Sequence, residues 1–285
     1  MLKSQYIIVG IGIVGIIGLF LLPKSVVSNK NKAIENPTVD TKTTSVDTTA
    51  QSGVTENHQI LLTEQQVTRL DILRNRFYKA STENEQHSLL DSLSSIYRPA
   101  NLLDSIAFYA DYIAKKFPSE HSQMLAGDAY YEVFSFAMSE KKVRSAAQKA
   151  KEYYEQILAE NPNNTEATVK LGVTYTITAT PMQGIKMIRS VLEKDPDNQL
   201  ALFNLGLLSM QSGQYDKAVE RFERLLQINP KDANSCMLLA QSLINLGKNE
   251  EAIKKLEAVK INLSESQVDK EAKMRIDAFL KDLKK

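Results

Sequence analysis

Histidines are the side chains best suited to metal binding or to proton transfer near neutral pH. The sequence holds three of them, His58, His87 and His121, and they lie far apart. None belongs to a His-Glu-x-x-His motif or to a similar ligand spacing. The sequence therefore predicts no metal site and no histidine-based catalysis.

A second short pattern, Ser139 to Lys142, matches the Ser-x-x-Lys motif of enzymes that use a serine nucleophile. The Ser-Asp-Asn and Lys-Thr-Gly motifs that accompany it in those enzymes do not occur, and neither does a Gly-Lys-Ser/Thr phosphate loop. We interpret the segment as a charged turn between two helices. The sequence thus predicts a protein that is not an enzyme and uses no cofactor.

Residues 6–22 carry no charge and consist mostly of Ile, Val, Leu and Gly. Within them, Gly10, Gly12 and Gly15 spell the Gly-x-Gly-x-x-Gly fingerprint of dinucleotide-binding domains. That fold needs a helix with a polar face followed by a second strand. Here the corresponding helix would be apolar on every side and would stop at Pro23. About 17 apolar residues can instead span a bilayer, and no Ala-x-Ala cleavage site is present after them, so we predict one N-terminal transmembrane helix.

Residues 24–57 are rich in Thr, Ser, Asn and Lys and show no apolar period, which predicts a disordered linker. The charges around the span leave the orientation open. Lys3 precedes it and Lys24, Lys30 and Lys32 come after it, which slightly favours a cytoplasmic C-terminal part. A short charged tail before an N-terminal anchor is, however, the common arrangement for exporting the rest of the chain. We expect the C-terminal part on the exported, periplasmic side.

Prolines recur at a constant interval further along the chain. Pro162, Pro196 and Pro230 are each 34 residues apart. Small residues share one position between them and large residues share another, namely Gly184, Ala218 and Ala252, and Ile188, Phe222 and Leu256. Such a period indicates stacked pairs of antiparallel helices, with Gly or Ala where helix axes approach and Pro after the last turn.

This pattern resembles the tetratricopeptide repeat. The residues that carry the resemblance are Leu171, Gly172, Tyr175 and Pro196, then Leu205, Gly206, Ala218, Phe222 and Pro230. The resemblance implies an all-α fold, a superhelical solenoid of helix-turn-helix units, here preceded by the one N-terminal transmembrane helix.

The same step continues toward the C-terminus with one change, because the proline position falls on Ser264. Cys236 stands in this last repeat, at a position normally buried between helices. As the only cysteine it has no partner for an internal disulfide, and we expect an unreactive packing residue.

Toward the N-terminus the period breaks, because Pro118 lies 44 residues before Pro162, ten more than one repeat. With Leu125-Ala126 as the small-residue pair, we expect the extra residues in two places. One is a first helix lengthened through Phe136, and the other is a longer turn around Ser139 to Lys142.

These observations divide the chain into eight segments. They are a transmembrane anchor (1–23), a disordered linker (24–57), a helical region with a degenerate repeat (58–120), a repeat with an insertion (121–164), three regular repeats (165–198, 199–232 and 233–264) and a C-terminal capping helix (265–285).

The formal net charge is +1, with 35 basic and 34 acidic residues. A chain so close to neutral has no strong field to attract nucleic acid, and we expect no nucleic-acid partner.

In tetratricopeptide repeats the first helix of each pair lines a concave groove that holds peptides or partner helices. The resemblance carries this role to nine residues here, which are Val169, Val173, Thr176, Phe203, Asn204, Leu207, Met210, Met237 and Gln241. Members that bind chaperone C-termini use a clamp of lysine, asparagine and arginine, and only Asn204 occupies such a position. An apolar groove suits a hydrophobic helix or an extended segment of another protein.

We therefore expect a membrane-anchored, non-catalytic scaffold that binds another protein in envelope assembly, secretion or protein maturation. One alternative is a self-assembling homo-oligomer, built through a glycine-bearing face of the membrane helix and the ends of the stack. Another is a cytoplasm-facing recruiter that brings soluble partners to the membrane.

Overall fold

The computed structural model describes residues 62–178 and 180–283, and within these ranges every regular element is a helix. The helices are α2 (Glu64–Lys79), α3 (Glu83–Tyr97), α4 (Leu103–Lys116), α5 (Glu120–Phe136), α6 (Glu140–Glu160), α7 (Thr165–Ile177), α8 (Pro181–Lys194), α9 (Gln199–Gln211), α10 (Tyr215–Ile228), α11 (Ala233–Asn245), α12 (Asn249–Asn262) and α13 (Gln267–Leu283). The all-α solenoid expected from the sequence is confirmed.

The predicted anchor (1–23) and linker (24–57) lie outside the described residues. Among the helices that the structure describes, none combines the length and hydrophobicity needed to cross a bilayer.

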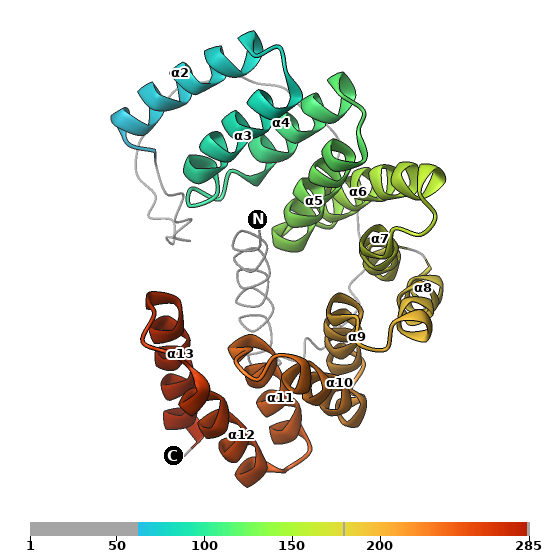
Figure 1. The fold of residues 1–285 in the computed structure, drawn as a ribbon, viewed down its shortest axis with the longest axis vertical. Helices are drawn as coiled ribbons and strands as arrows, with labels where there is room; N and C mark the ends of the chain where they lie inside the picture. The colour runs from blue at the N-terminus through green and yellow to red at the C-terminus, as the bar shows by residue number, and fades with distance from the viewer. Residues whose placement is uncertain (1–61, 179, 284–285) are drawn as a thin grey trace, which may run out of the picture.

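Successive helices pack against each other and trace a curved path (Figure 1). From α5 onward, the odd-numbered helices α5, α7, α9 and α11 lie toward the inside of the curve, and their even-numbered partners lie outside (Figure 1). Helices α2 and α13 flank its open side. We call the side of α5, α7, α9 and α11 that faces the centre of the curve the inner face.

The regular repeats begin with the same capping contact. Asn164, Asn198 and Asp232 precede α7, α9 and α11, and each side chain accepts a hydrogen bond from a backbone N–H in the first turn of the next helix. This bond satisfies one of the N–H groups that a helix start leaves unpaired. Because the three caps are 34 residues apart, the sequence period is also the period of helix starts.

The turns inside two of the pairs are also alike. Gly213 and Gly247 have φ of 71° and 76°, the left-handed region that favours glycine. In each turn the next N–H, of Gln214 or Lys248, bonds back to a carbonyl of the preceding helix at 2.8 or 2.9 Å. These short turns let α10 and α12 fold back onto α9 and α11.

Close packing within each pair rests on the small and large positions read from the sequence. A Cβ atom built on Gly172 would lie 2.6 Å from Ile188, and one built on Gly206 would lie 2.7 Å from Phe222. In α7 and α8 the backbones approach further, since a Cβ on Gly184 would lie 2.1 Å from the Gly172 carbonyl oxygen. Glycine at both positions therefore brings this pair together.

The repeat with the insertion corrects two expectations. Helix α5 has 17 residues against 13 in α9, as expected, but most of the extra length lies in α6, which has 21 residues against 14 in α10. Ser139 accepts a hydrogen bond from the Lys142 N–H and caps α6. The expectation of a longer turn around Ser139 to Lys142 was therefore wrong. A Cβ atom built on Gly127 would lie 2.7 Å from the Tyr154 ring, so Gly127 is the small residue of this repeat. The expected small-residue pair Leu125-Ala126 was therefore misplaced by one position.

The buried residues form three clusters. One extends from α2 to α7 and another from α9 to α13. Between them lies a small cluster of Val169, Val173, Ile188, Val191, Ala201 and Leu205. Cys236 is fully buried in the second cluster, as expected, and burial raises the pKa of its thiol to about 12.

Candidate protein-binding face

The nine residues predicted to line a groove divide into two groups by exposure. Val169 has no exposed surface and packs in the cluster between α7, α8 and α9. Val173, Asn204 and Met237 are at most 9% exposed. The remaining five are partly exposed, and they are Thr176, Phe203, Leu207, Met210 and Gln241.

The polar members of the set bond to their own helices. The Asn204 amide donates to the Leu200 carbonyl at 2.8 Å, and the Thr176 hydroxyl donates to the Val173 carbonyl at 2.6 Å. These bonds satisfy a buried amide and a helix-end hydroxyl without any other residue. Asn204, the only residue in a clamp-like position, is therefore already hydrogen-bonded within α9.

Helix α9 presents the longest apolar row. Phe203, Leu207 and Met210 succeed each other at spacings of four and three, which places them on one side of the helix. Phe203 packs edge-on against Phe222 of α10, with ring centroids 6.3 Å apart. The three side chains thus rest on the core of their own repeat and keep part of their surface open to solvent.

The corrected position of Gly127 extends this comparison to α5. The residue after the small one is Val173 in α7, Leu207 in α9 and Gln241 in α11, and each was predicted to line the groove. In α5 that residue is Asp128. A shift of one position in the sequence pattern hid it, because the expected pair Leu125-Ala126 assigned this place to Gly127.

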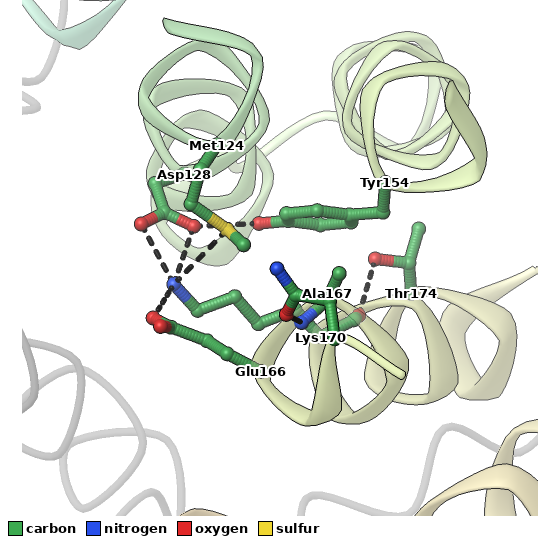
Figure 2. Close-up of polar contacts among 8 residues, drawn as sticks. Met124, Asp128, Tyr154, Glu166, Ala167, Lys170 and Thr174 are labelled. Carbon is green, nitrogen blue, oxygen red and sulfur yellow. Dashed lines mark hydrogen bonds and ion pairs between the residues drawn. The ribbon is translucent and has the colours of Figure 1, made fainter. Parts of the chain in front are cut away.

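Asp128 is the centre of a polar cluster where α5 and α7 meet (Figure 2). Lys170 of α7 contacts both of its carboxylate oxygens, at 2.6 and 2.7 Å, and also Glu166 at 2.7 Å. The Tyr154 hydroxyl, reaching in from α6, donates to Asp128 at 2.9 Å. Side chains from three helices therefore meet at one carboxylate.

Charge and burial explain how the cluster titrates. Burial lowers the pKa of Lys170, but Asp128 and Glu166 raise it more, so the pKa lies above its usual value. Burial, and then the charge of Asp128, raises the pKa of Tyr154. Lys170 is thus a cation and Tyr154 a neutral hydrogen-bond donor near neutral pH. The four-residue spacing of Glu166 and Lys170 predicts their pairing, but nothing in the sequence shows that Asp128, 42 residues before Lys170, joins them.

Two hollows lie elsewhere, beside α4. One of about 260 Å³ is bounded by α4, α5 and α6 and includes Lys115, Gln123 and Tyr153. The other, of about 450 Å³, lies along α4 and includes Phe108 and Tyr112. Neither contains any of the nine predicted residues. In the described ranges no group of three His, Cys, Asp or Glu side chains is arranged to hold a metal ion.

Ser139, Lys142 and the histidines were the residues examined in the sequence for catalysis or metal binding, and the described ones take part in helix capping, an ion pair and a ring contact. Ser139 caps α6 and the Lys142 ammonium pairs with Asp104, so the Ser-x-x-Lys match is a helix start. His58 lies outside the described residues. His87 and His121, far apart in the sequence, are in contact, with ring centroids 4.6 Å apart.

Comparison with solved structures gives several similar chains. A tetratricopeptide repeat protein from Parabacteroides merdae is 19% identical, with 76% of this chain and 82% of that one covered and a TM-score of 0.49. A MamA structure is 18% identical, with 57% and 90% covered and a TM-score of 0.42. MamA 41-end from Desulfovibrio magneticus RS-1 is 15% identical, with 60% and 92% covered and a TM-score of 0.41.

Comparison with curated protein sequences finds no match. Two family models, both described as tetratricopeptide repeat, match residues 181–233 and 209–266. These ranges contain the repeated positions 34 residues apart and the helix pairs that those positions build. Residues 181–266 of this chain therefore match the tetratricopeptide repeat.

Proposed function

We propose that this chain is a membrane-anchored, non-catalytic scaffold that binds an apolar helix or extended segment of another protein on the inner face of α9 and α11. The observation that carries the proposal is the partly exposed row Phe203, Leu207 and Met210. Solvent-open apolar side chains on one side of a helix lose contact with water when a partner covers them, which favours binding.

The neighbouring helix supports the same surface. On α11, Gln241 is partly exposed and Met237 is 8% exposed. Thioether side chains adapt to irregular apolar partners because they are unbranched and flexible. The row on α9 and these residues on α11 would contact the anchoring apolar side chains of a partner, with Gln241 at the polar rim.

Val169 supports this surface from below. It is fully buried and belongs to the cluster that joins α7, α8 and α9. Its role in the proposal is to fix the position of α9 against α7, and a partner would not touch it.

Site-specific photocrosslinking in the native host tests the surface. A photoreactive residue at position 241 is expected to give a discrete crosslinked species, and the same residue at position 220 is not, because Glu220 lies exposed on α10. Met210→Lys should abolish the crosslink from position 241, and Glu220→Lys should leave it intact. Equal crosslinking from both positions, or no effect of Met210→Lys, would contradict the proposed face.

Membrane attachment through residues 6–22, with the repeats on the exported side, is part of the proposal and rests on the apolar sequence of that segment. Reporters active only inside or only outside the cell, fused after Lys285 in a bacterial host, test the orientation. Outside activity supports envelope or secreted partners. Inside activity would replace this arrangement with a cytoplasm-facing recruiter.

A further inference from the structure

The two histidines in the described residues meet where α3 packs near the start of α5. The rings of His87 and His121 have centroids 4.6 Å apart and an interplanar angle of 64°. The His87 side chain is 13% exposed, and its Nε2 atom is buried without a hydrogen-bond partner. His121 lies in the first turn of α5 and is exposed.

The charged and titratable groups that act on His87 come from α3 and α5. The Glu83 carboxylate, one turn before His87 on α3, has an oxygen 3.8 Å from His87 Nε2. That same oxygen accepts a hydrogen bond from the Ser119 hydroxyl, which caps α5. Asp91, one turn after His87, and His121 on α5 are the other groups that act on His87. Glu83 thus links the starts of α3 and α5 while it faces the imidazole.

Two neutral imidazoles can stay in edge-to-face contact, because neither carries a net charge. Protonation of both would place two positive charges at contact distance, one of them on a largely buried ring. We propose that this imidazole pair makes the packing of α3 against the start of α5 sensitive to acid. The two helices stay packed while both rings are neutral, and their contact weakens when the rings are protonated.

The direction of the effect comes from proton linkage. Burial lowers the pKa of His87 from 6.5, the nearby His121 lowers it further, and Glu83 and Asp91 raise it by less. A histidine with a lowered pKa in the folded state binds its proton more readily when unfolded. Its contribution to stability is unchanged above pH 6.5 and is lost as the pH falls from 6.5 toward the folded-state pKa.

Hydrogen exchange on the full-length chain, read by mass spectrometry at pH 7.5 and 5.5 in buffer with a chelator, tests this proposal. After correction for the intrinsic pH dependence of exchange, peptides from α3 and the first turns of α5 should exchange several-fold faster at pH 5.5. Peptides from α9 to α12 supply the internal control, because those helices contain no histidine. Equal acid sensitivity of both sets of peptides would overturn the proposal.

Three variants assign the effect to the pair. His121→Gln is the main one, because His121 is exposed and its replacement leaves the core intact. It should remove most of the acid-induced increase, and His87→Gln should remove it as well. His58→Gln, which changes the chain's third histidine, should leave the increase unchanged. An increase that survives in His121→Gln and in His87→Gln would refute the role of the pair.

Discussion

In the pair α5–α6 the large side chain over the small position is Tyr154, and in α9–α10 it is Phe222. Both are fully buried, and both cover a glycine whose built Cβ would lie 2.7 Å from the ring. They differ at the para position of the ring, where the Tyr154 hydroxyl donates to Asp128. The residue that corresponds to Asp128 in α9 is the apolar Leu207.

The same contrast recurs around α4 and α5. The Asp111 carboxylate accepts hydrogen bonds from the hydroxyls of Tyr153, at 2.8 Å, and Tyr130, at 3.4 Å. Glu132, only 5% exposed, pairs with Arg98 at 2.9 Å. Burial raises the pKa of Glu132 and Arg98 lowers it. The earlier repeats are therefore joined by carboxylates. Between α9 and α12 the buried polar side chains are neutral, namely Asn204, Ser209, Ser235 and Ser242.

One stacking geometry thus tolerates two kinds of chemistry, provided that the small and large positions keep their volumes. The family models match only residues 181–266, where those positions hold the apolar residues of the ordinary pattern. The difference also reaches partly exposed residues, which form a charged cluster where α5 and α7 meet and an apolar row on α9. Substitutions that act on one chemistry and not the other test whether this contrast is real.

The largest effect is expected from Gly184→Ala, at the pair that joins the two regions. A Cβ there would lie 2.1 Å from the backbone carbonyl of Gly172, so α7 and α8 must move apart. We expect a loss of about 3 kcal/mol in the free energy of unfolding, from overpacking against backbone. Urea denaturation monitored by circular dichroism measures it.

Gly213→Ala is the matched control, because a Cβ on Gly213 meets nothing within 4 Å and only the φ of 71° is unfavourable. Its cost should be about 1 kcal/mol. If the two variants lose the same stability, close backbone approach does not distinguish the α7–α8 pair.

Next in size is Lys170→Met, which keeps the apolar stem of the side chain and removes its charge. Asp128 then keeps only the Tyr154 hydroxyl as a partner, and α5 loses its ionic link to α7. Because Lys170 is 17% and Asp128 34% exposed, solvent screens part of the loss, and we expect about 2 kcal/mol.

The corresponding change among the later repeats is Lys255→Met, which removes an ion pair with Glu223 between α12 and α10. Both side chains are about one third exposed, at 37% and 33%. We expect a loss below about 1 kcal/mol by the same denaturation measurement. Equal losses for Lys170→Met and Lys255→Met would show that the cluster at Asp128 is an ordinary surface pair.

Much of the fold could be predicted from the sequence wherever successive repeats keep the 34-residue period. The spacing of Pro162, Pro196 and Pro230 is mirrored by the caps Asn164, Asn198 and Asp232, because a helix end and the next helix start are fixed by the same short turn. The register failed between Pro118 and Pro162, since local spacing cannot show how ten extra residues divide between two helices.

The candidate face was harder to predict, because periodicity gives the side of a helix and not the depth of a side chain. Val169 and Phe203 occupy equivalent positions, yet Val169 is fully buried and Phe203 is partly exposed. The reason is local, since Val169 packs among residues of three helices in the small cluster between α7 and α9. Asp128 was missed for the separate reason that its position depends on the register of the insertion.

Introducing a hydroxyl into the apolar region sharpens the comparison. Phe222→Tyr should cost about 2 kcal/mol, because Leu207 offers no acceptor where Asp128 serves Tyr154. The double variant Phe222→Tyr with Leu207→Asp supplies that acceptor and should recover part of the loss. A double-mutant cycle measures the coupling free energy between the two substitutions. A value of zero would mean that the residue at position 207 does not determine whether tyrosine or phenylalanine is preferred at position 222.

A smaller effect than that of Phe222→Tyr is expected from the reverse change, Tyr154→Phe. The ring keeps its place over Gly127, so packing is conserved, and only the 2.9 Å hydrogen bond to Asp128 is lost. Both carboxylate oxygens of Asp128 still contact the Lys170 ammonium, so the carboxylate keeps a partner. We expect a loss of about 1 kcal/mol. In the Lys170→Met background the same change should cost more, because it then removes the last partner of Asp128, and additive losses would show that the tyrosine and the lysine stabilise α5 independently.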